Sequence, residues 1–165
     1  MRHQSGEFLD NFLKRHTDLQ TVLDVGSADI SGTIKNYLSG KEYLGVDMVP
    51  APNVDEVVNG HELKDHFKDR KFDLVICFDV FEHDDAFWLT LEGLRYVTKP
   101  GGYMMIGVPC RNCPEHNHPA DYWRFMPQCV DVFYKGFEDI EHVVQKDDPS
   151  HCAEDEIYMV GRKPL

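Results

Sequence analysis

The fold of this chain is decided by the stretch Val22-Leu23-Asp24-Val25-Gly26-Ser27, which is followed by Tyr43-Leu44-Gly45-Val46-Asp47. Each stretch has the apolar pattern of a parallel strand and carries a carboxylate near its end. A strand that runs into a glycine turn lets backbone amides approach a ligand, and an acid at the end of the next strand can accept hydrogen bonds from both ribose hydroxyls. Gly26 and Asp47 are 21 residues apart, the separation that such a unit requires. The two stretches therefore predict a nucleoside site.

Length and charge limit the kind of protein that this can be. At 165 residues the chain is long enough for one domain with a substantial core and too short for two, so we expect a single domain over residues 1–165. Asp and Glu number 29 against 17 Lys and Arg, and the negative field that results repels phosphate backbones and anionic lipid. We therefore expect neither nucleic acid nor a membrane among its partners.

The sequence also indicates a compartment. No apolar run reaches the roughly 20 residues of a membrane span, and no apolar signal core follows the first residues. The five cysteines are an odd number, which fits a reducing compartment better than a disulfide framework. We expect a cytoplasmic protein.

Strand-like and helix-like patterns alternate along the chain. An amphipathic helix should follow the cap residue Ser5, with its apolar face on the core rather than serving as a lid. Its helical spacing comes from Phe8, Leu9, Phe12 and Leu13. Further strands are expected at residues 21–25, 54–58, 72–78 and 103–108, and helices or helical turns at 33–38, 61–68, 87–97 and 127–134, the last beginning with proline.

Two features complete the predicted sheet. Residues 72–78 form a nearly continuous apolar run, which is typical of a parallel strand buried on both faces in the middle of a sheet. Residues 137–144 and 156–162 are both strand-like with no helix between them, so the sheet should end in an antiparallel hairpin. The sequence predicts an α/β fold with a Rossmann-like, doubly wound, mostly parallel sheet of about seven strands.

Five motifs occur in a characteristic order: residues 22–26, Asp47, residues 72–83, Lys99-Pro100-Gly101-Gly102 and Asp121-Tyr122-Trp123-Arg124-Phe125. Their order and spacing resemble class I S-adenosylmethionine-dependent methyltransferases, from Val22 to Arg162. The last motif resembles small-molecule and glycan-type members, the methyltransferase type 11-like group. The resemblance implies S-adenosyl-L-methionine as cofactor and a small-molecule acceptor as partner.

The resemblance also implies which residues contact the cofactor. The glycine turn would lie against its methionine end, Asp24 would contact its amino group directly or through water, and Asp47 would hold its ribose. The full set is Asp24, Gly26, Ser27, Asp47, Met48, Gly60, His61 and Phe78. Ala28 and Ile30 stand where the family's later glycines belong, so we expect Gly32 to take over the tight turn. The Gly-x-Gly-x-x-Gly fingerprint is absent, which argues against a nicotinamide cofactor.

His83 is the candidate catalytic base. It follows the strand at residues 72–78, which places it at the carboxyl end of the sheet, where open α/β proteins build their sites. Methyl transfer to a hydroxyl is an in-line displacement that needs a base, and an imidazole can accept that proton near neutral pH. The alternative is that His83 orients the following helix; Glu82 is interpreted as a structural partner.

A second polar group lies further along the chain. The resemblance places it over the methyl-transfer site as substrate contacts: His116, His118, Tyr122 and Arg124. Arg124 could fork onto a substrate carboxylate. The alternative is a loop fixed to the sheet, with Trp123 and Phe125 in the core and Arg124 in an internal ion pair.

Cys110, Cys113, His116 and His118 raise the question of a metal. Cys-x-x-Cys is a familiar first half of a zinc site. A closed zinc site usually draws its second pair from a separate element, whereas four ligands within nine residues would strain a tetrahedron. We expect no bound metal, with zinc at these four residues as the alternative.

These features predict S-adenosylmethionine-dependent methyl transfer to a hydroxyl, in preference to an amine, of a small-molecule or sugar-like acceptor. The alternative is a catalytically silent, methyltransferase-like binding or scaffold subunit that pairs with a partner chain. The atypical glycine loop and the short length favour that alternative. The sequence leaves both a homodimer and a partner subunit open.

Overall fold

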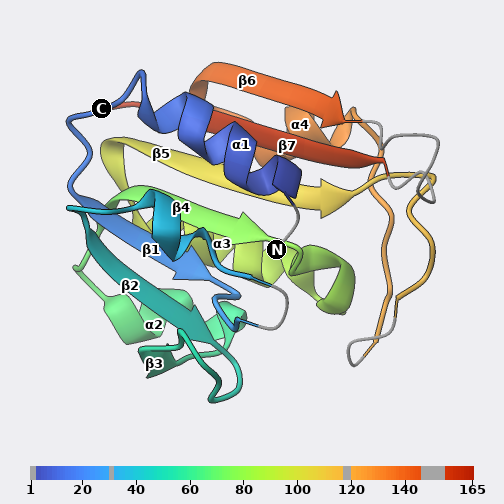
Figure 1. Cartoon of the computed structure of the whole chain (residues 1–165), viewed down its shortest axis with the longest axis horizontal. Helices are drawn as coiled ribbons and strands as arrows, with labels where there is room; N and C mark the ends of the chain where they lie inside the picture. The colour runs from blue at the N-terminus through green and yellow to red at the C-terminus, as the bar shows by residue number, and fades with distance from the viewer. Residues whose placement is uncertain (1–2, 30–31, 117–119, 146–154) are drawn as a thin grey trace.

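A seven-stranded sheet forms the centre of the computed structural model, which describes residues 3–29, 32–116, 120–145 and 155–165 (Figure 1). The strand order is β3-β2-β1-β4-β5-β7-β6. The strands are β1 (Thr21–Val25), β2 (Glu42–Asp47), β3 (Glu56–Val57), β4 (Phe72–Phe78), β5 (Thr98–Pro109), β6 (Glu138–Gln145) and β7 (Glu156–Arg162). β1 to β5 pair in parallel, whereas β7 runs antiparallel to both β5 and β6. The predicted Rossmann-like sheet with an antiparallel end is confirmed.

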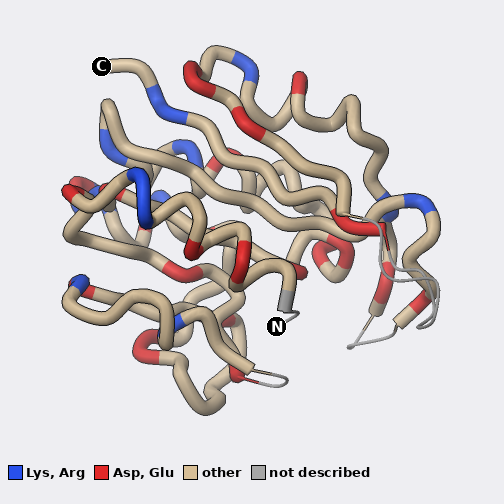
Figure 2. The backbone as a smooth tube through the Cα atoms, turned by 45° about the horizontal axis from the view of Figure 1, so that its top comes forward, with Lys and Arg blue, Asp and Glu red and all other residues tan. Residues whose placement is uncertain are grey.

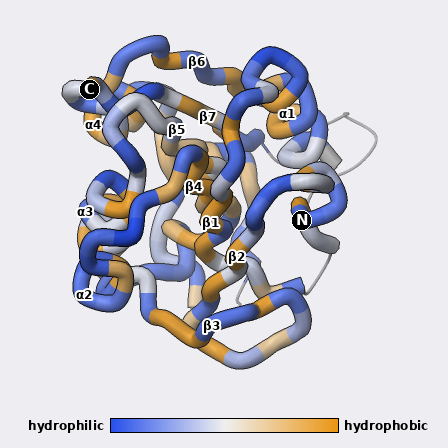
Figure 3. The backbone as a smooth tube through the Cα atoms, turned by 90° about the vertical axis from the view of Figure 1, so that its left-hand side faces the viewer, coloured by the Kyte–Doolittle hydropathy of each residue, from blue (hydrophilic) through white to orange (hydrophobic). Residues whose placement is uncertain are grey.

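Helices cover both faces of the sheet (Figure 3). They are α1 (His3–Leu13), α2 (Leu63–Phe67), α3 (Phe87–Val97) and α4 (Cys129–Phe133), with the 3-10 helices η1 (Ile34–Tyr37), η2 (Gly60–Glu62) and η3 (Phe81–His83). α1 and η1 pack on one face, and α2, α3 and α4 pack on the other. Leu9 and Phe12 of α1 are buried, so its apolar face lies on the core as expected.

The apolar run of β4 is explained by its place between the two helical layers. Leu74 and Ile76 belong to the core under α1, and Val75 and Cys77 belong to the core under α2, α3 and α4. Because successive strand residues point to opposite faces, a strand buried on both sides must be apolar at every position. All four side chains are buried.

Two predicted elements before β4 are shorter than expected. In place of a helix at 33–38 the chain makes the single 3-10 turn of η1, in which the Thr33 hydroxyl accepts a hydrogen bond from the N–H of Lys35 at 3.1 Å. The strand expected at 54–58 is confined to β3, because the chain is still turning at Val54, whose N–H donates to the carbonyl of Ala51 at 3.2 Å.

The helix expected at 127–134 begins two residues late. α4 starts at Cys129, and Pro127 lies in the preceding turn, in which the N–H of Cys129 donates to the carbonyl of Met126 at 2.8 Å. The proline therefore belongs to a turn that leads into the helix and is not its first residue.

Charge is distributed unevenly between the two ends of the parallel strands. These strands point to the right in Figure 1, and the Lys and Arg segments in Figure 2 lie mainly on the left, at their amino ends. The carboxyl ends, where Asp24, Asp47 and Glu82 lie, are thus the more acidic side. No helix among the described residues is both long and apolar enough to cross a membrane.

Candidate functional site

β1 ends in a turn that requires glycine. Gly26 has a φ of +84°, and a Cβ there would lie 2.2 Å from Cγ2 of Val80, which follows β4. The N–H groups of Gly26 and Ser27 both donate to the carbonyl of Val46 in β2, at 2.9 and 3.1 Å. The turn is therefore fixed among the carboxyl ends of β1, β2 and β4.

Asn53 holds this loop in place where the family's later glycines are missing. Its Nδ2 lies 3.0 Å from the carbonyl oxygen of Ser27, 3.0 Å from Oγ1 of Thr33 and 2.7 Å from Oη of Tyr43. The two amide hydrogens are thus shared among three acceptors. Asn53 itself has a φ of +72°, a conformation that asparagine tolerates better than most residues. Gly32 has a φ of +119°, a backbone conformation that favours glycine; its part in the tight turn stays a prediction.

Asp24 and Asp47 lie together beside this loop. Asp24 is 5% exposed and accepts a hydrogen bond from the Tyr43 hydroxyl at 2.7 Å. Burial raises the pKa of Asp24 to about 7, the Tyr43 hydrogen bond opposes the shift, and the charge of Asp47 adds to it. Asp47 is half-buried, and its two oxygens accept from the N–H groups of Ala28 at 3.3 Å and Val49 at 3.2 Å. The two carboxylates therefore act on one region.

A second cluster lies after β4, where η3 meets the segment that follows β5. The side chain of Glu82 has no exposed surface, and its Oε1 lies 3.7 Å from Nε2 of His83 and 3.7 Å from Nε2 of His116. The two imidazole rings meet edge to face, with centroids 5.0 Å apart. Neither carboxylate oxygen of Glu82 accepts a hydrogen bond from any residue that the structure describes.

Backbone carbonyls orient both histidines of this cluster. Nδ1 of His83 is hydrogen-bonded to the carbonyl of Ala120, and Nδ1 of His116 to the carbonyl of Pro114 at 3.2 Å. A carbonyl can only accept, so each Nδ1 carries the hydrogen and each neutral ring has its lone pair on Nε2. The Glu82 carboxylate raises the pKa of His116.

Cys77 shows that the two clusters are neighbours. It lies in β4 and is fully buried. Burial raises the pKa of its thiol, and the charges of Glu82 and Asp24 raise it further. Asp24 of β1 is paired with Ile76, the residue before Cys77, and Glu82 lies in η3 just after β4, so both clusters adjoin the end of the same central strand.

A family model described as a methyltransferase domain matches residues 1–145. The chain belongs to this family. It carries a methyltransferase domain over most of its length. A search of curated protein sequences gives no match.

Solved structures of methyltransferases share the fold at low sequence identity. TehB from Haemophilus influenzae superposes with a TM-score of 0.73 and 16% identity, covering 98% of this chain and 62% of that one. The 1,6-didemethyltoxoflavin-N1-methyltransferase of Burkholderia thailandensis, solved with 1,6-didemethyltoxoflavin and S-adenosylhomocysteine, gives 0.71 and 18%, covering 97% and 78%. The N-methyltransferase NodS from Bradyrhizobium japonicum WM9 gives 0.68 and 15%, covering both chains completely. This methyltransferase thus spans about three fifths of the length of TehB.

The donor set at the ends of β1 and β2 fits S-adenosylmethionine. The cofactor presents a vicinal diol and an ammonium, whose hydrogens suit carboxylate acceptors, and a sulfonium, whose positive charge suits an acidic surrounding. Asp47 would hold the ribose hydroxyls and Asp24 would face the ammonium, with Gly26 allowing close backbone approach. Ser27 directs its hydroxyl to the carbonyl of Asn53 at 3.2 Å, so its side chain serves the loop and only its backbone is left for the cofactor.

The other residues that were expected to line the cofactor lie at the same sheet edge in different surroundings. Met48 is 64% exposed directly after Asp47. Gly60 packs against Thr90, and Nε2 of His61 is 2.8 Å from Oδ1 of Asp84. Phe78 belongs to the core under α1, where its ring meets that of Tyr158 at 5.7 Å. Their contacts with the cofactor stay predictions.

Arg124 is used within the methyltransferase itself, which corrects the expectation that it grips a substrate. Two of its nitrogens fork onto Asp121, Nε donates to the carbonyl of Cys113 at 2.9 Å, and the remaining hydrogens go to the carbonyls of Pro114 and Trp123, each at 2.7 Å. All five N–H donors of a guanidinium are thus occupied. The ion pair lowers the pKa of Asp121, whose carboxylate also accepts from the N–H of His116 at 2.8 Å. Arg124 therefore positions the loop that carries His116.

The other residues expected to contact the substrate lie in three different places. His116 belongs to the cluster, and His118 lies outside the described residues. Tyr122 is 53% exposed and donates its backbone N–H to the carbonyl of Glu82 at 2.7 Å, so its ring is available to an acceptor. Phe125 is in the core, as the alternative interpretation of this segment has it, whereas Trp123 is 37% exposed and donates Nε1–H to the carbonyl of Asp84 at 2.8 Å.

The alternative zinc site is not formed by the residues that the structure describes. Cys110 and Cys113 are both buried, joined by a turn in which the N–H of Cys113 donates to the carbonyl of Cys110 at 3.1 Å. Within the described ranges, the His, Cys, Asp and Glu side chains that converge as three possible ligands are Glu82, His83 and His116. The two thiols therefore do not join His116.

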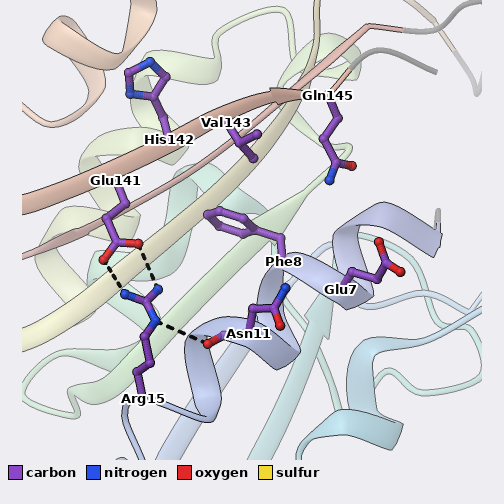
Figure 4. Close-up of a pocket in the computed structure, with 8 residues that line it drawn as sticks. All are labelled: Glu7, Phe8, Asn11, Arg15, Glu141, His142, Val143 and Gln145. Carbon is purple, nitrogen blue, oxygen red and sulfur yellow. Dashed lines mark hydrogen bonds and ion pairs between the residues drawn. The ribbon is translucent and has the colours of Figure 1, made fainter. Parts of the chain in front are cut away.

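A shallow hollow of about 330 Å³ lies between α1 and β6 (Figure 4). The guanidinium of Arg15 forks onto Glu141 across it, at 2.7 and 2.8 Å. None of its lining residues belongs to either cluster. We interpret it as the seam between α1 and β6, outside the methyl-transfer site.

Sequence reasoning missed Asn53 and Tyr43, which organise the cofactor side. A signal for Asn53 was available, because an asparagine after Pro52 in a turn is a common left-handed residue. Tyr43 gave no such signal, since an aromatic residue in a strand is ordinary.

Proposed function

We propose that this methyltransferase transfers the methyl group of S-adenosylmethionine to a hydroxyl oxygen of a small-molecule or sugar-like acceptor. The observation that carries the proposal is the position of His83, which follows β4 beside the strand ends that hold Asp24 and Asp47. A hydroxyl must lose its proton as it attacks, whereas a neutral amine can attack without a base. Nε2 of His83 faces the buried Glu82, whose charge would stabilise the imidazolium formed on accepting that proton.

The reaction divides between the cofactor and the residues of the chain. S-adenosylmethionine, when bound, would supply an electrophilic methyl group for the acceptor oxygen and a neutral thioether as leaving group, which keeps the carbon–sulfur electron pair. His83 receives the hydroxyl proton at Nε2, while its Nδ1–H stays on the carbonyl of Ala120 and fixes the ring. Because the leaving group is neutral, the other residues act mainly by positioning the acceptor.

Oxygen and nitrogen acceptors can be separated by labelling. S-adenosylmethionine carrying a ¹³C-methyl group is incubated with pairs of sugar-like acceptors that differ only in a hydroxyl or an amine. We expect the carbon NMR signal of an O-methyl product. A product methylated only on nitrogen would contradict the proposal; NodS and the Burkholderia enzyme are both named as N-methyltransferases.

The role of His83 is tested by His83→Gln. Loss of general-base catalysis should lower kcat by about 10²–10⁴-fold, with unchanged binding of S-adenosylhomocysteine by isothermal titration. His142→Gln is the matched control, since His142 is exposed on β6, and its kcat should equal that of the wild type. Cofactor binding without a methylated product from any acceptor would favour a catalytically silent subunit.

A further inference from the structure

Glu82, His83 and His116 have the composition and proximity of a metal-ligand set. Their possible ligand atoms all lie within 4.8 Å of one another. Glu82 is fully buried, and neither of its oxygens accepts a hydrogen bond from the described part of the chain. A buried carboxylate without hydrogen bonds is costly unless a positive charge accompanies it. A metal ion bound to the cluster would supply such a charge directly at the Glu82 carboxylate.

The distances suit a shared ion better than direct contacts. Oε1 of Glu82 is 3.7 Å from Nε2 of each histidine, too long for a hydrogen bond. Two ligands bonded to one ion at about 2.1 Å in a tetrahedral arrangement lie roughly 3.4 Å apart. The two distances from Glu82 are therefore within about 0.3 Å of that geometry.

The atoms around the cluster orient the ligands as metal sites usually do. Nδ1–H of His83 and Nδ1–H of His116 each point to a backbone carbonyl, which turns both Nε2 lone pairs toward Glu82. Arg124 and Asp121 fix the loop, and Asp121 binds the backbone of His116. The three side chains come from two separate segments, residues 82–83 and 116, so the ligands are not crowded on one short loop.

We propose that Glu82, His83 and His116 bind a divalent transition-metal ion and leave at least one coordination position for the acceptor oxygen. Two imidazoles and one carboxylate favour zinc, manganese, iron or cobalt over magnesium and calcium. The open position would lie toward His116, whose side chain is 36% exposed against 17% for His83.

The ion's role in catalysis rests on the proposed function, whereas its binding does not. A hydroxyl coordinated to such an ion loses its proton more readily, as bound water does. With the ion bound, Nε2 of His83 is a ligand and the acceptor's proton leaves to solvent; Nε2 acts as the base, as proposed above, only in the metal-free enzyme. Methyl transfer is otherwise unchanged, with the new carbon–oxygen bond formed as the carbon–sulfur bond breaks.

Metal titration tests the site directly. The full chain, purified without a metal-affinity column and stripped with EDTA, is titrated with Zn²⁺ and with Mn²⁺ by calorimetry. The variant is Glu82→Gln, and the matched control is Glu56→Gln, because Glu56 pairs with His66 at 2.6 Å on the exposed surface. We expect one ion per chain for the wild type and the control, and affinity 10–100-fold weaker for Glu82→Gln. Equal affinities of the wild type and Glu82→Gln, or no stoichiometric binding, would overturn the proposal.

Cobalt identifies the ligands. Co²⁺ bound to nitrogen and oxygen ligands should give visible bands without the near-ultraviolet thiolate charge-transfer band. A thiolate band that disappears in Cys113→Ser would assign the ion to the cysteines and overturn the site proposed here.

Cofactor binding and product formation are measured on the same samples. Unchanged binding of S-adenosylhomocysteine shows that Glu82→Gln is folded. Stoichiometric metal binding without any O-methyl product would support the metal site and contradict the proposed function. Full turnover in the metal-free enzyme would remove the ion's role in catalysis.

Discussion

The carboxyl ends of β1 and β4 each carry a buried carboxylate, and the two differ in their surroundings. Asp24 accepts a hydrogen bond from Tyr43, which is in turn held by Asn53. Glu82 is equally buried, yet neither of its oxygens accepts a hydrogen bond from the described residues, and Nε2 of His83 and of His116 each lie 3.7 Å from its Oε1. We call the first site the closed network, because its carboxylate is hydrogen-bonded within the protein, and the second the open cluster, because its carboxylate is not.

This difference indicates how the two sites meet their ligands. A cofactor that is common to a whole family can be bound by a preformed hydrogen-bond network. Asn53 and Tyr43 form such a network around the loop after β1, although this loop lacks the family's later glycines. The Glu82 cluster has rigid supports, but its carboxylate accepts no hydrogen bond from the described residues, as expected of a site that is completed by what it binds. The experiments below separate these two conditions.

The largest effect should come from Gly26→Ala. A Cβ would meet Val80 at 2.2 Å, and alanine is strained at a φ of +84°, so the free energy of unfolding should fall by about 3–5 kcal/mol. Gly40→Ala isolates the strain, since Gly40 has a φ of +80° with no atom within 4 Å, and should cost about 1–2 kcal/mol. Urea unfolding measures both. Equal costs for the two variants would show that the turn does not press on Val80.

The Asp24 network should make stability depend on pH. The folded pKa of about 7 lies above the ordinary value of 3.8, so the native state keeps a proton that the unfolded state releases. The free energy of unfolding should therefore fall as the pH rises from about 4 to 7, by at most about 4 kcal/mol, and be flat above that range. Asp24→Asn should lack this component. The check is the wild-type minus variant difference in urea unfolding from pH 4 to 8, and a constant difference would contradict the raised pKa.

Removing the side chain of Asn53 should open the closed network. Asn53→Ala loses hydrogen bonds to the loop and places alanine at a φ of +72°, at a cost of about 2–3 kcal/mol. Asn53→Gly keeps the backbone conformation and should cost about 1–2 kcal/mol. Both should weaken binding of S-adenosylhomocysteine, measured by titration calorimetry. Unweakened binding would mean that the glycine turn needs no support from this residue.

Much of this fold could be predicted from the sequence, because it rests on patterns that the sheet itself imposes. The register pairs Asp24 with Gly45 and Val25 with Val46, so Asp47 extends to the same edge as the Gly26 turn. The short elements were less predictable. The single turn of η1 is capped by the Thr33 hydroxyl, and the five residues of α4 are held by the packing of Val130 and Phe133 in the core, so neither is set by its own periodicity.

The sites were predicted only in part, because several of their contacts join residues that are far apart in the sequence. His83 was found from its place after a strand, but its partner His116 is 33 residues away and reaches it through the loop that Arg124 holds. Glu82 was interpreted as structural because its burial could not be read from the sequence. Asn53 acts on Ser27, 26 residues earlier, so its role required the folded loop.

The smallest effect should have the opposite sign and come from the open cluster. In metal-free protein, Glu82→Gln replaces a buried carboxylate that lacks hydrogen bonds by a neutral side chain of the same shape, so the free energy of unfolding should rise by about 1–2 kcal/mol. Asp24→Asn shows no such rise at pH 4, because Asp24 is already protonated there. Urea unfolding of both variants at pH 4 and pH 8, with EDTA, makes the measurement. A loss of stability in Glu82→Gln at pH 8 would mean that the carboxylate is already satisfied by the protein, and the two strand ends would then differ only in their ligands.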